Sequence, residues 1–486
     1  MKKFIVALGL FAFTLAVNGH QKENTEIFNV KTFGAVGDSI TMDTKAIQAT
    51  IDACNAKGGG MVWVPAGKYH IGTIRLKSNV TLSLDYGAYL LGSQNIADYD
   101  PDLTKTREGN AECLIFAENA TNITIEGLGV IDGRGTHIAF PRMQEDRKRL
   151  PRPRLLRMAN CSNLTFSGVT YKRPAFWGIH LVDCKNIHFN GVTVHFRNNN
   201  YNNDGLDLDG CHEVLIENCD IEAGDDAICL KSSLHPCRNI VVRNCRVSSN
   251  TSPLKFGTSS SGGFIDVKVT NCYFYDCPMG AIKLQLVDGG QLENVDISRI
   301  VMEDVGNPIF IRLGNRGNNF VKNMNMRGNR EGADKGVPVG TLKNVGISDV
   351  VAEVTVESPE EEAEVVYKRI DLAKQNLTPE QLAVKQKTRS GPIMITGIPG
   401  HYVENVTLEN IEISYPGGGS QADAERVVPE DEKRYPEQFF FGVLPAWGAY
   451  IRHARNITFK NVKMTTRNPD QREMIVLDDV EGFVNE

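Results

Sequence analysis

Two clusters of aspartates in the middle of the chain offer the residues best suited to acid–base chemistry. The first reads DGLDLD over residues 204–209, and the second is the pair Asp225-Asp226. Clustered carboxyl groups suit hydrolysis of a glycosidic bond, because one carboxylic acid can protonate the leaving oxygen while an ionised carboxylate takes a proton from the attacking water. The spacing therefore indicates a hydrolytic site, if the two clusters meet in space.

Two other interpretations of these aspartates stay open. Clustered carboxylates also bind hard cations such as Ca²⁺, and the sequences Asp-Gly and Gly-Asp-Asp are common in turns. Three carboxyl groups within several ångströms of one another repel, and at least one of them should then have a raised pKa. A surface without a task would avoid such a cluster.

A repeated phrase surrounds the clusters and indicates how they are brought together. Its copies read SNLTFSGVT, KNIHFNGVTV, HEVLIENCDI, RNIVVRNCRV, IDVKVTNCYF and ENVDISRIVM, with second residues at positions 163, 186, 213, 239, 266 and 294. Successive copies are thus 23, 27, 26, 27 and 28 residues apart, and each alternates apolar and polar residues. A fixed period in the twenties with strand-like alternation predicts an all-β solenoid, and a single-stranded parallel β-helix fits it best.

The coil period predicts that the aspartates lie side by side. Asp204 and Asp226 are 22 residues apart, Lys255 follows 29 residues later, and Lys283 follows after another 28. We expect these residues, together with Asp225, to form one column on neighbouring coils. Because stacked strands are about 4.8 Å apart, the three carboxyl groups would then lie within several ångströms of one another.

The repeat also accounts for the cysteines of the chain. Cys219, Cys245 and Cys272 each follow an asparagine and are 26 and 27 residues apart. Equivalent residues of a solenoid stack on one another, so we expect a buried cysteine ladder beside an asparagine turn ladder. We favour that interpretation over disulfides or metal ligands, because cysteine packs well as a small apolar residue.

The ends and insertions differ from the repeat. Residues 1–19 are typical of a secretory signal peptide, because a basic start precedes an apolar run too short to span a bilayer. A helix over about residues 43–56 is expected to cap the open end of the β-helix. We expect the β-helix to cover residues 26–480, with insertions at about 136–155, 316–340 and 357–390.

Composition narrows the partners. The net charge of −6 gives no argument for nucleic acid, and no segment beyond the N-terminus approaches membrane length. The signal peptide predicts a secreted or periplasmic protein, and the carboxylate cluster favours a polysaccharide or oligosaccharide as its partner; a monomer is expected. An acidic polymer would need a local basic patch, which the 136–155 loop could supply.

At the aspartate clusters the sequence resembles glycoside hydrolase family 28, the polygalacturonase family. The matching residues are NNDG at 202–205 and GDD at 224–226. Residues 152–187 look like the coil that leads into the family's site, and residues 441–459 are similar to a C-terminal segment of bacterial members. The resemblance covers nearly the whole chain after the signal peptide.

This resemblance implies a right-handed parallel β-helix and hydrolysis with inversion. It implies that Asp225 is the general acid, and that Asp204 and Asp226 hold and activate the water. Neither a metal nor another cofactor is expected, because carboxyl groups supply both proton transfers.

The chain departs from the family's pattern at two places. The family has Gly-His-Gly in the coil after the aspartates, whereas this chain has NTSPLKFGTSSSGG without a histidine. The family's Arg-Ile-Lys, which grips a galacturonate carboxylate, is Ala281-Ile282-Lys283 here. Lys gives a point charge instead of the bidentate fork of Arg, so a rhamnogalacturonan backbone becomes at least as plausible a substrate as homogalacturonan.

Five residues are expected to bind the substrate. Lys255 has no counterpart in the family pattern and is either a cleft residue that replaces lost positive charge or a solvated strand lysine. The expected substrate-binding set is Asn202, Lys255, Lys283, Arg312 and Arg316.

The leading hypothesis is an exported glycosidase acting on pectic material of the galacturonide or rhamnogalacturonan type. One alternative is a β-helix polysaccharide lyase, which needs Ca²⁺ or another neutralising cation and a base such as Lys255. A second alternative is a non-catalytic glycan-binding solenoid, although such a module has no need of a carboxylate cluster.

Overall fold

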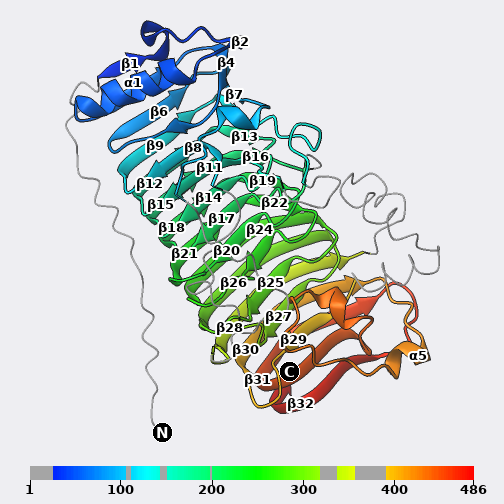
Figure 1. The fold of residues 1–486 in the computed structure, drawn as a ribbon. Helices are drawn as coiled ribbons and strands as arrows, with labels where there is room; N and C mark the ends of the chain where they lie inside the picture. Colours follow the sequence, from blue (N-terminus) through cyan, green and yellow to red (C-terminus); the bar gives the residue numbers. More distant parts are fainter. Residues whose placement is uncertain (1–25, 105–110, 143–149, 198–199, 318–336, 356–389) are drawn as a thin grey trace.

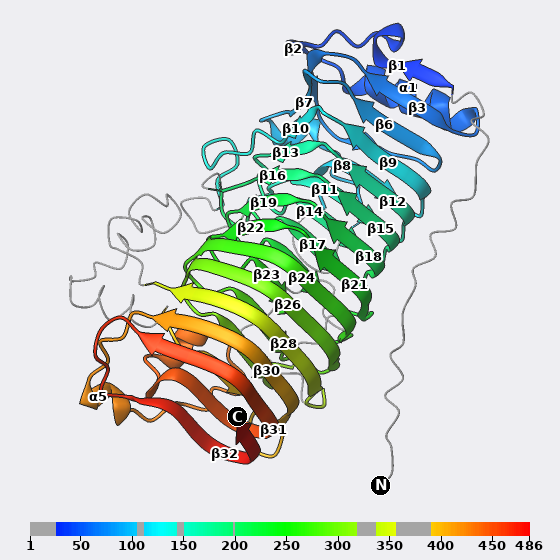
Figure 2. The ribbon, with the colours of Figure 1, turned by 180° about the vertical axis from the view of Figure 1, so that it is seen from behind.

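The computed structural model describes residues 26–104, 111–142, 150–197, 200–317, 337–355 and 390–486. Within these ranges the chain winds into one column of stacked coils, whose strands pair in parallel with their counterparts on the next coil (Figure 1). Figure 2 shows the same ladder of strands from behind. The expected signal peptide at 1–19, nearly all of the insertions at 316–340 and 357–390, and the centre of the 136–155 loop lie outside the described residues.

Three ribbons of strands run along the column. The ribbon that carries the aspartates, called the site sheet below, consists of β5 (Ile74–Arg75), β8 (Cys113–Glu118), β11 (Arg154–Ala159), β14 (Ile179–Val182), β17 (Leu206–Asp209), β20 (Ile228–Lys231), β23 (Leu254–Phe256), β25 (Ile282–Leu286), β27 (Ile309–Leu313) and β29 (Ile393–Thr396). The second consists of β1 (Ile27–Asn29), β3 (Gly60–Val64), β6 (Val80–Leu84), β9 (Thr121–Gly127), β12 (Ser162–Ser167), β15 (Lys185–Asn190), β18 (His212–Glu217) and β21 (Cys237–Arg243). The third consists of β2 (Asp38–Met42), β4 (Gly67–Ile71), β7 (Ala88–Gly92), β10 (Val130–Asp132), β13 (Thr170–Lys172), β16 (Thr193–His195), β19 (Asp220–Ala223) and β22 (Arg246–Ser249).

In the later coils the second and third ribbons merge into long bent strands, and the last two of these also continue the site sheet. Alternate residues of every strand point into the column, where they form one continuous apolar core. The long strands are β24 (Phe264–Cys277), β26 (Gln291–Val305), β28 (Thr341–Val354), β30 (Val403–Tyr415), β31 (Ala446–Thr466) and β32 (Glu473–Asn485).

The bend between the second and third ribbons confirms the expected ladders. Asn218, Asn244 and Asn271 adopt left-handed backbone angles, with φ of 57°, 55° and 53°, which asparagine tolerates better than most residues. Asn244 donates to Asn218 at 3.3 Å and accepts from Asn271 at 2.8 Å. The cysteine that follows each asparagine is buried, and all 11 cysteines of the chain are free thiols.

The expected helix is α1 (Thr44–Ala56), which closes the N-terminal end of the column (Figure 1). Its buried residues Ile47, Ile51 and Cys54 pack onto the core of the first coils. The chain leaves the helix at Lys57, and Gly58 takes a left-handed φ of 97° before β3 begins. A repeat protein needs such a cap, because its terminal coil would otherwise expose the core.

A segment that the sequence did not mark as an insertion, residues 416–445, leaves the coil between β30 and β31. It contains the short helix α5 (Gln421–Ala424) and a single-turn helix over Gln438–Phe441. In Figure 1 it is the orange segment that lies over β27 and β29, where the rings of Phe310 and Phe441 are 6.4 Å apart.

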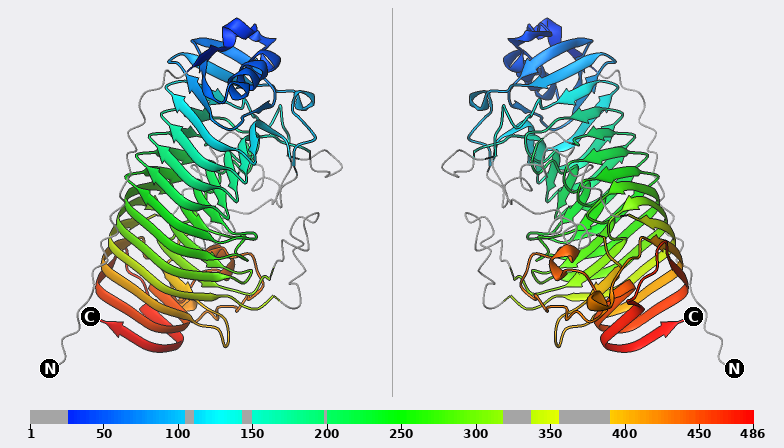
Figure 3. Two further views of the ribbon diagram at one scale, coloured as in Figure 1. Left: turned by 90° about the vertical axis from the view of Figure 1, so that its left-hand side faces the viewer. Right: turned by 90° about the vertical axis from the view of Figure 1, so that its right-hand side faces the viewer.

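The edge-on views of Figure 3 show the coils stacked one below the other along the column. None of the helices in the described ranges has the length and apolar character that crossing a lipid bilayer would require.

Replacing Asn244 tests what the ladder contributes. Asn244→Ala should lower the free energy of unfolding by about 1–2 kcal/mol, because it removes two hydrogen bonds and places a Cβ-bearing residue without a compensating amide in a left-handed conformation. Asn244→Gly loses the same bonds but keeps the backbone unstrained, so it should cost less. Urea unfolding of both variants measures the difference. Equal costs for the two would show that backbone conformation has no part in the effect.

Candidate active site

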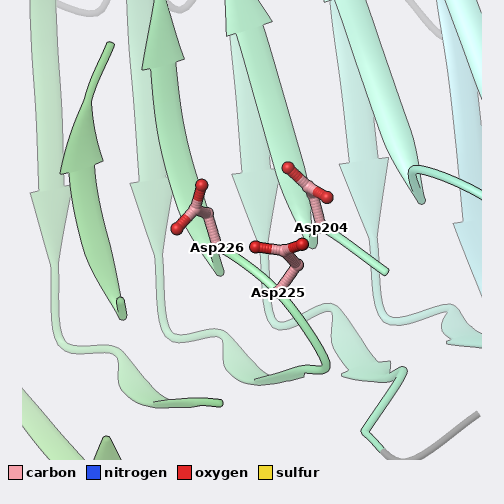
Figure 4. A group of neighbouring side chains, drawn as sticks. All are labelled: Asp204, Asp225 and Asp226. Atoms are coloured by element: carbon pink, nitrogen blue, oxygen red, sulfur yellow. The ribbon is translucent and has the colours of Figure 1, made fainter. Parts of the chain in front are cut away.

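The aspartates lie where the site sheet begins on two successive coils. Asp204 and Asp226 precede β17 and β20 by two residues each, and the N–H of Gly205 donates to the carbonyl oxygen of Asp226 at 2.8 Å. Asp225 occupies the turn just before. Figure 4 shows the three carboxyl groups grouped together, with Asp225 between the other two. The ladder of the coil therefore holds these side chains next to one another.

The three carboxyl groups meet as the coil period predicts. One oxygen from each lies within 4.8 Å of the others. Asp204 and Asp226 are buried and Asp225 is partly exposed. The prediction that the two clusters meet is confirmed.

Asp226 is the carboxylate that stays ionised. Its Oδ2 accepts from the Nζ of Lys255 at 2.8 Å, and its Oδ1 accepts from the Oγ1 of Thr251 at 2.8 Å. Burial alone would raise the pKa of Asp226, but the positive charges of Lys255 and Lys283 outweigh it and lower the pKa. A solvated role for Lys255 is excluded, because its side chain is only 3% exposed.

The other two carboxyl groups hold their protons more tightly. Burial and the negative charge of Asp226 raise the pKa of Asp225 to about 6. Burial and the charges of Asp207 and Asp225 raise the pKa of Asp204 well above its usual value. The cluster therefore combines one ionised carboxylate with two groups that favour the protonated form, which is the division that acid–base chemistry needs.

Asn202 contacts the expected acid directly. Its Nδ2 donates to Oδ2 of Asp225 at 3.3 Å, while its Oδ1 accepts from a guanidinium nitrogen of Arg152 at 2.9 Å. The hydroxyl of Thr251 lies 3.3 Å from the other oxygen of Asp225. Asn202 thus positions Asp225 in the structure, and its predicted contact with substrate stays a prediction.

The expected single column of aspartates and lysines is wrong in its register. In the ladder, Lys255 stands beside Lys283 on one side and Cys229 on the other, and Cys229 stands beside Asp207. The counterpart of Asp226 on the next coil is Ser252, whose carbonyl oxygen accepts from the N–H of Ala227 at 2.9 Å. Lys255 reaches Asp226 diagonally, through the length of its side chain.

Lys283 has a partner that the sequence did not suggest. Its Nζ donates to Oε2 of Glu437 at 2.5 Å, and Lys255 Nζ lies 3.5 Å from the other oxygen of the same carboxylate. Lys283 is fully buried. Glu437 comes from the 416–445 segment, outside the repeat, so coil periodicity carries no signal for it.

Arg312 and Arg316 are also held by the protein. Arg312 is 2% exposed and donates to the carbonyl oxygens of Gly397 and Glu430, both at 2.9 Å. Arg316 forms an ion pair with Asp288 and donates to the carbonyl oxygen of Thr258 at 3.0 Å. Their predicted contacts with substrate stay predictions.

Close to the aspartates, cationic side chains lie over the rings of Phe176 and Trp177. The guanidinium of Arg154 lies 5.1 Å from the ring centre of Phe176 and 4.9 Å from that of Trp177. Lys231 lies 4.6 Å from Trp177 and 3.4 Å from the carboxylate of Asp207. Asp207 is in the first acidic cluster and Lys231 follows the second, so the coil period could have predicted that they lie close together. The coil period could not have predicted the contact of Lys231 with Trp177.

The same three carboxyl groups are the candidate for a cation site. One oxygen from each is close enough to share an ion, but Ca²⁺ prefers six to eight oxygen ligands. The ammonium of Lys255 already lies 2.8 Å from Asp226, and a second cation there would be repelled. The donor set therefore fits Ca²⁺ poorly.

Comparison with known proteins places the chain. Residues 54–318, more than half of the 486-residue chain, match Glycosyl hydrolases family 28. The chain belongs to this family. A probable polygalacturonase of Vitis vinifera is 29% identical over 293 residues, which are 56% of this chain and 60% of that protein. An exo-poly-alpha-D-galacturonosidase of Dickeya chrysanthemi is 27% identical over 303 residues, 51% of this chain and 50% of its own length.

A solved family 28 structure supports the fold. The family 28 exopolygalacturonase of Yersinia enterocolitica superposes with a TM-score of 0.68 at 20% identity, covering 94% of this chain and 78% of that one. The right-handed parallel β-helix expected for this family member is confirmed. The matches to the two sequence relatives span only about half to three fifths of their lengths.

The raised pKa of Asp225 makes stability depend on pH. Because the pKa is about 6 in the folded protein and 3.8 without its environment, folding favours the protonated form; this contribution is complete below about pH 4 and is lost as the pH rises through about 6. Asp225→Asn should therefore be more stable than the wild type at pH 7 by about 1–3 kcal/mol and nearly equal to it at about pH 4.

Urea unfolding at both pH values measures this gap. Asp296→Asn is the matched control, because Asp296 is an exposed carboxylate paired with Lys268 and should show no widening. A gap between Asp225→Asn and the wild type that stays constant with pH would contradict the assignment.

Calcium should not stabilise the site. Because Lys255 neutralises Asp226, millimolar Ca²⁺ is expected to leave the melting temperature unchanged, and a chelator should leave activity intact. Differential scanning calorimetry with and without Ca²⁺ checks this. A rise in melting temperature that disappears in Asp204→Asn would identify the cluster as a cation site instead.

Proposed function

We propose that the protein is an exported glycoside hydrolase that cleaves pectic polysaccharide or oligosaccharide of the galacturonide or rhamnogalacturonan type. The observation that carries the proposal is the cluster of three carboxyl groups, in which the ion pair with Lys255 lowers the pKa of Asp226 while burial raises the pKa of Asp225 to about 6. Membership of family 28 supports it. Export rests on the signal peptide expected at residues 1–19.

Asp225 supplies the proton for the leaving group. Its carboxyl proton passes to the glycosidic oxygen as the bond from that oxygen to the anomeric carbon breaks. Water attacks the anomeric carbon from the opposite face and gives its proton to Asp226. Asp225 ends ionised and Asp226 protonated, and exchange with solvent restores both. Such an acid works best when its pKa lies close to the working pH.

Asp204 holds the attacking water beside Asp226. Its Oδ1 is buried and has no hydrogen-bond partner among the described residues, which leaves that atom for water. The expected outcome is inversion at the anomeric carbon. In glycosidases, carboxyl groups about 5–5.5 Å apart usually accompany retention. The 4.8 Å within which the three aspartates meet is a distance between single oxygens, not between whole carboxyl groups. The anomer formed first, observed by NMR, decides between the two outcomes.

The lyase alternative is less well supported. A lyase base must be unprotonated, and Lys255 is the candidate. Burial alone would lower the pKa of Lys255, but the charge of Asp226 outweighs burial and raises the pKa well above its usual value. Lys255 therefore stays protonated. A lyase product would also absorb ultraviolet light through its new double bond, and hydrolysis yields none.

Replacing the acid tests the mechanism. Asp225→Asn should lower kcat by about 10²–10⁴-fold, because an amide cannot protonate the leaving oxygen. The assay is the release of reducing sugar from pectic fractions, with identification of the sugar released. Asp296→Asn serves again as the charge-matched control and should retain wild-type activity. A folded Asp225→Asn protein with near-normal turnover would remove Asp225 from the acid role.

A further inference from the structure

Glu437 is a buried acid that reaches the site from outside the repeat. Its side chain is 5% exposed, and its two oxygens lie 2.5 Å from Lys283 Nζ and 3.5 Å from Lys255 Nζ. The carboxylate thus bridges two ammonium groups on adjacent strands of the site sheet. Lys255 also donates a hydrogen bond to Asp226. Glu437 and the expected base, Asp226, therefore share Lys255 as a partner.

The residues before Glu437 fix it in place. The hydroxyl of Tyr435 accepts from Lys255 Nζ at 3.3 Å, and the carbonyl oxygen of Pro436 accepts from the side-chain amide of Gln285 at 2.7 Å. Residues 435–437 therefore each bond to a side chain of β23 or β25. This is a specific attachment of the segment to the site sheet.

The charges on this side of the aspartates are balanced. Lys255 and Lys283 carry two positive charges, and Asp226 and Glu437 supply two negative ones. Buried ions are costly unless they are paired, and here both lysines have their carboxylates. The carboxylate of an acidic sugar would bring a third negative charge to a site whose ammonium groups are already occupied.

We propose that Glu437 is a resident carboxylate that occupies the anion site of Lys255 and Lys283, so that the subsite over β23 and β25 takes a neutral sugar and rejects a uronate. The inference rests on the proposed hydrolase function and specifies its substrate. A backbone in which uronate and neutral sugars alternate satisfies this subsite. An unesterified polyuronate does not, because every one of its sugars carries a carboxylate.

The first test compares acidic and neutral forms of one backbone. Oligogalacturonides and their methyl esters share one backbone, and the ester replaces the negative charge of each sugar by a neutral methyl ester. The wild type should have at least about tenfold higher kcat/KM for the ester, and Glu437→Gln should shift that ratio at least about tenfold towards the acid. Glu409→Gln, which removes a carboxylate from an exposed pair with Lys460, should leave the ratio unchanged.

The second test needs no turnover. Glu437→Ala leaves room for a small carboxylate, so acetate and free galacturonate should raise the melting temperature of this variant and not that of the wild type. Galactose, the neutral counterpart of galacturonate, should raise the melting temperature of neither protein. If the variant is unfolded without ligand, recovery of structure in acetate is the same positive result.

Three outcomes overturn the inference. The first is a wild type that prefers the acidic oligosaccharide, and the second is a Glu437→Gln variant whose preference equals that of the wild type. The third is a Glu437→Ala protein that acetate and galacturonate do not stabilise. If the wild type cleaves no pectic substrate, the proposed function falls, while the acetate measurement still decides whether Glu437 occupies an anion site.

Discussion

One backbone hydrogen bond determines how close the two aspartates of the site lie. The N–H of Gly205 donates to the carbonyl oxygen of Asp226, and this step of the ladder forces the side chains of Asp204 and Asp226 onto adjacent coils. Their repulsion cannot be relieved by moving apart, because the strands on either side are locked in the same ladder. The cost appears instead as raised pKa values of Asp204 and Asp225, and an ammonium group beside Asp226 lowers the pKa of the third carboxyl group.

The sequence was informative wherever the repeat governs position. Asp204 and Asp226 occupy equivalent places in their coils, so a count of residues was enough to bring them together, and the same holds for Cys219, Cys245 and Cys272. Periodicity reports which coil a residue belongs to and which way its side chain points. It therefore predicted the fold and the meeting of the aspartates, whereas the capping helix was predicted from a separate amphipathic segment before the repeat.

The coil period failed to predict contacts that depend on the length of a side chain or on a segment outside the repeat. Lys255 lies three positions beyond the true counterpart of Asp226, and only its long side chain restores the contact. Glu437 is 154 residues from Lys283 in the sequence, and no local pattern in YPEQFFFG marks its target. Repulsion within the cluster already predicted a raised pKa for at least one aspartate, and the family resemblance implied which one is the acid. The structure adds the ion pair with Lys255 that lowers the pKa of Asp226.

The attachment of residues 435–437 changes how the column can come apart. In a solenoid most contacts join neighbouring coils, so coils can fray from an end while the middle stays folded. Here the 416–445 segment begins after β30, well beyond the aspartates, yet returns to β23 and β25. Fraying that reached β30 and β31 would withdraw Glu437 and leave two buried ammonium groups with one carboxylate. The coils that carry the aspartates are thereby coupled to the integrity of coils farther along the column, and loss of the Glu437 ion pairs would precede global unfolding.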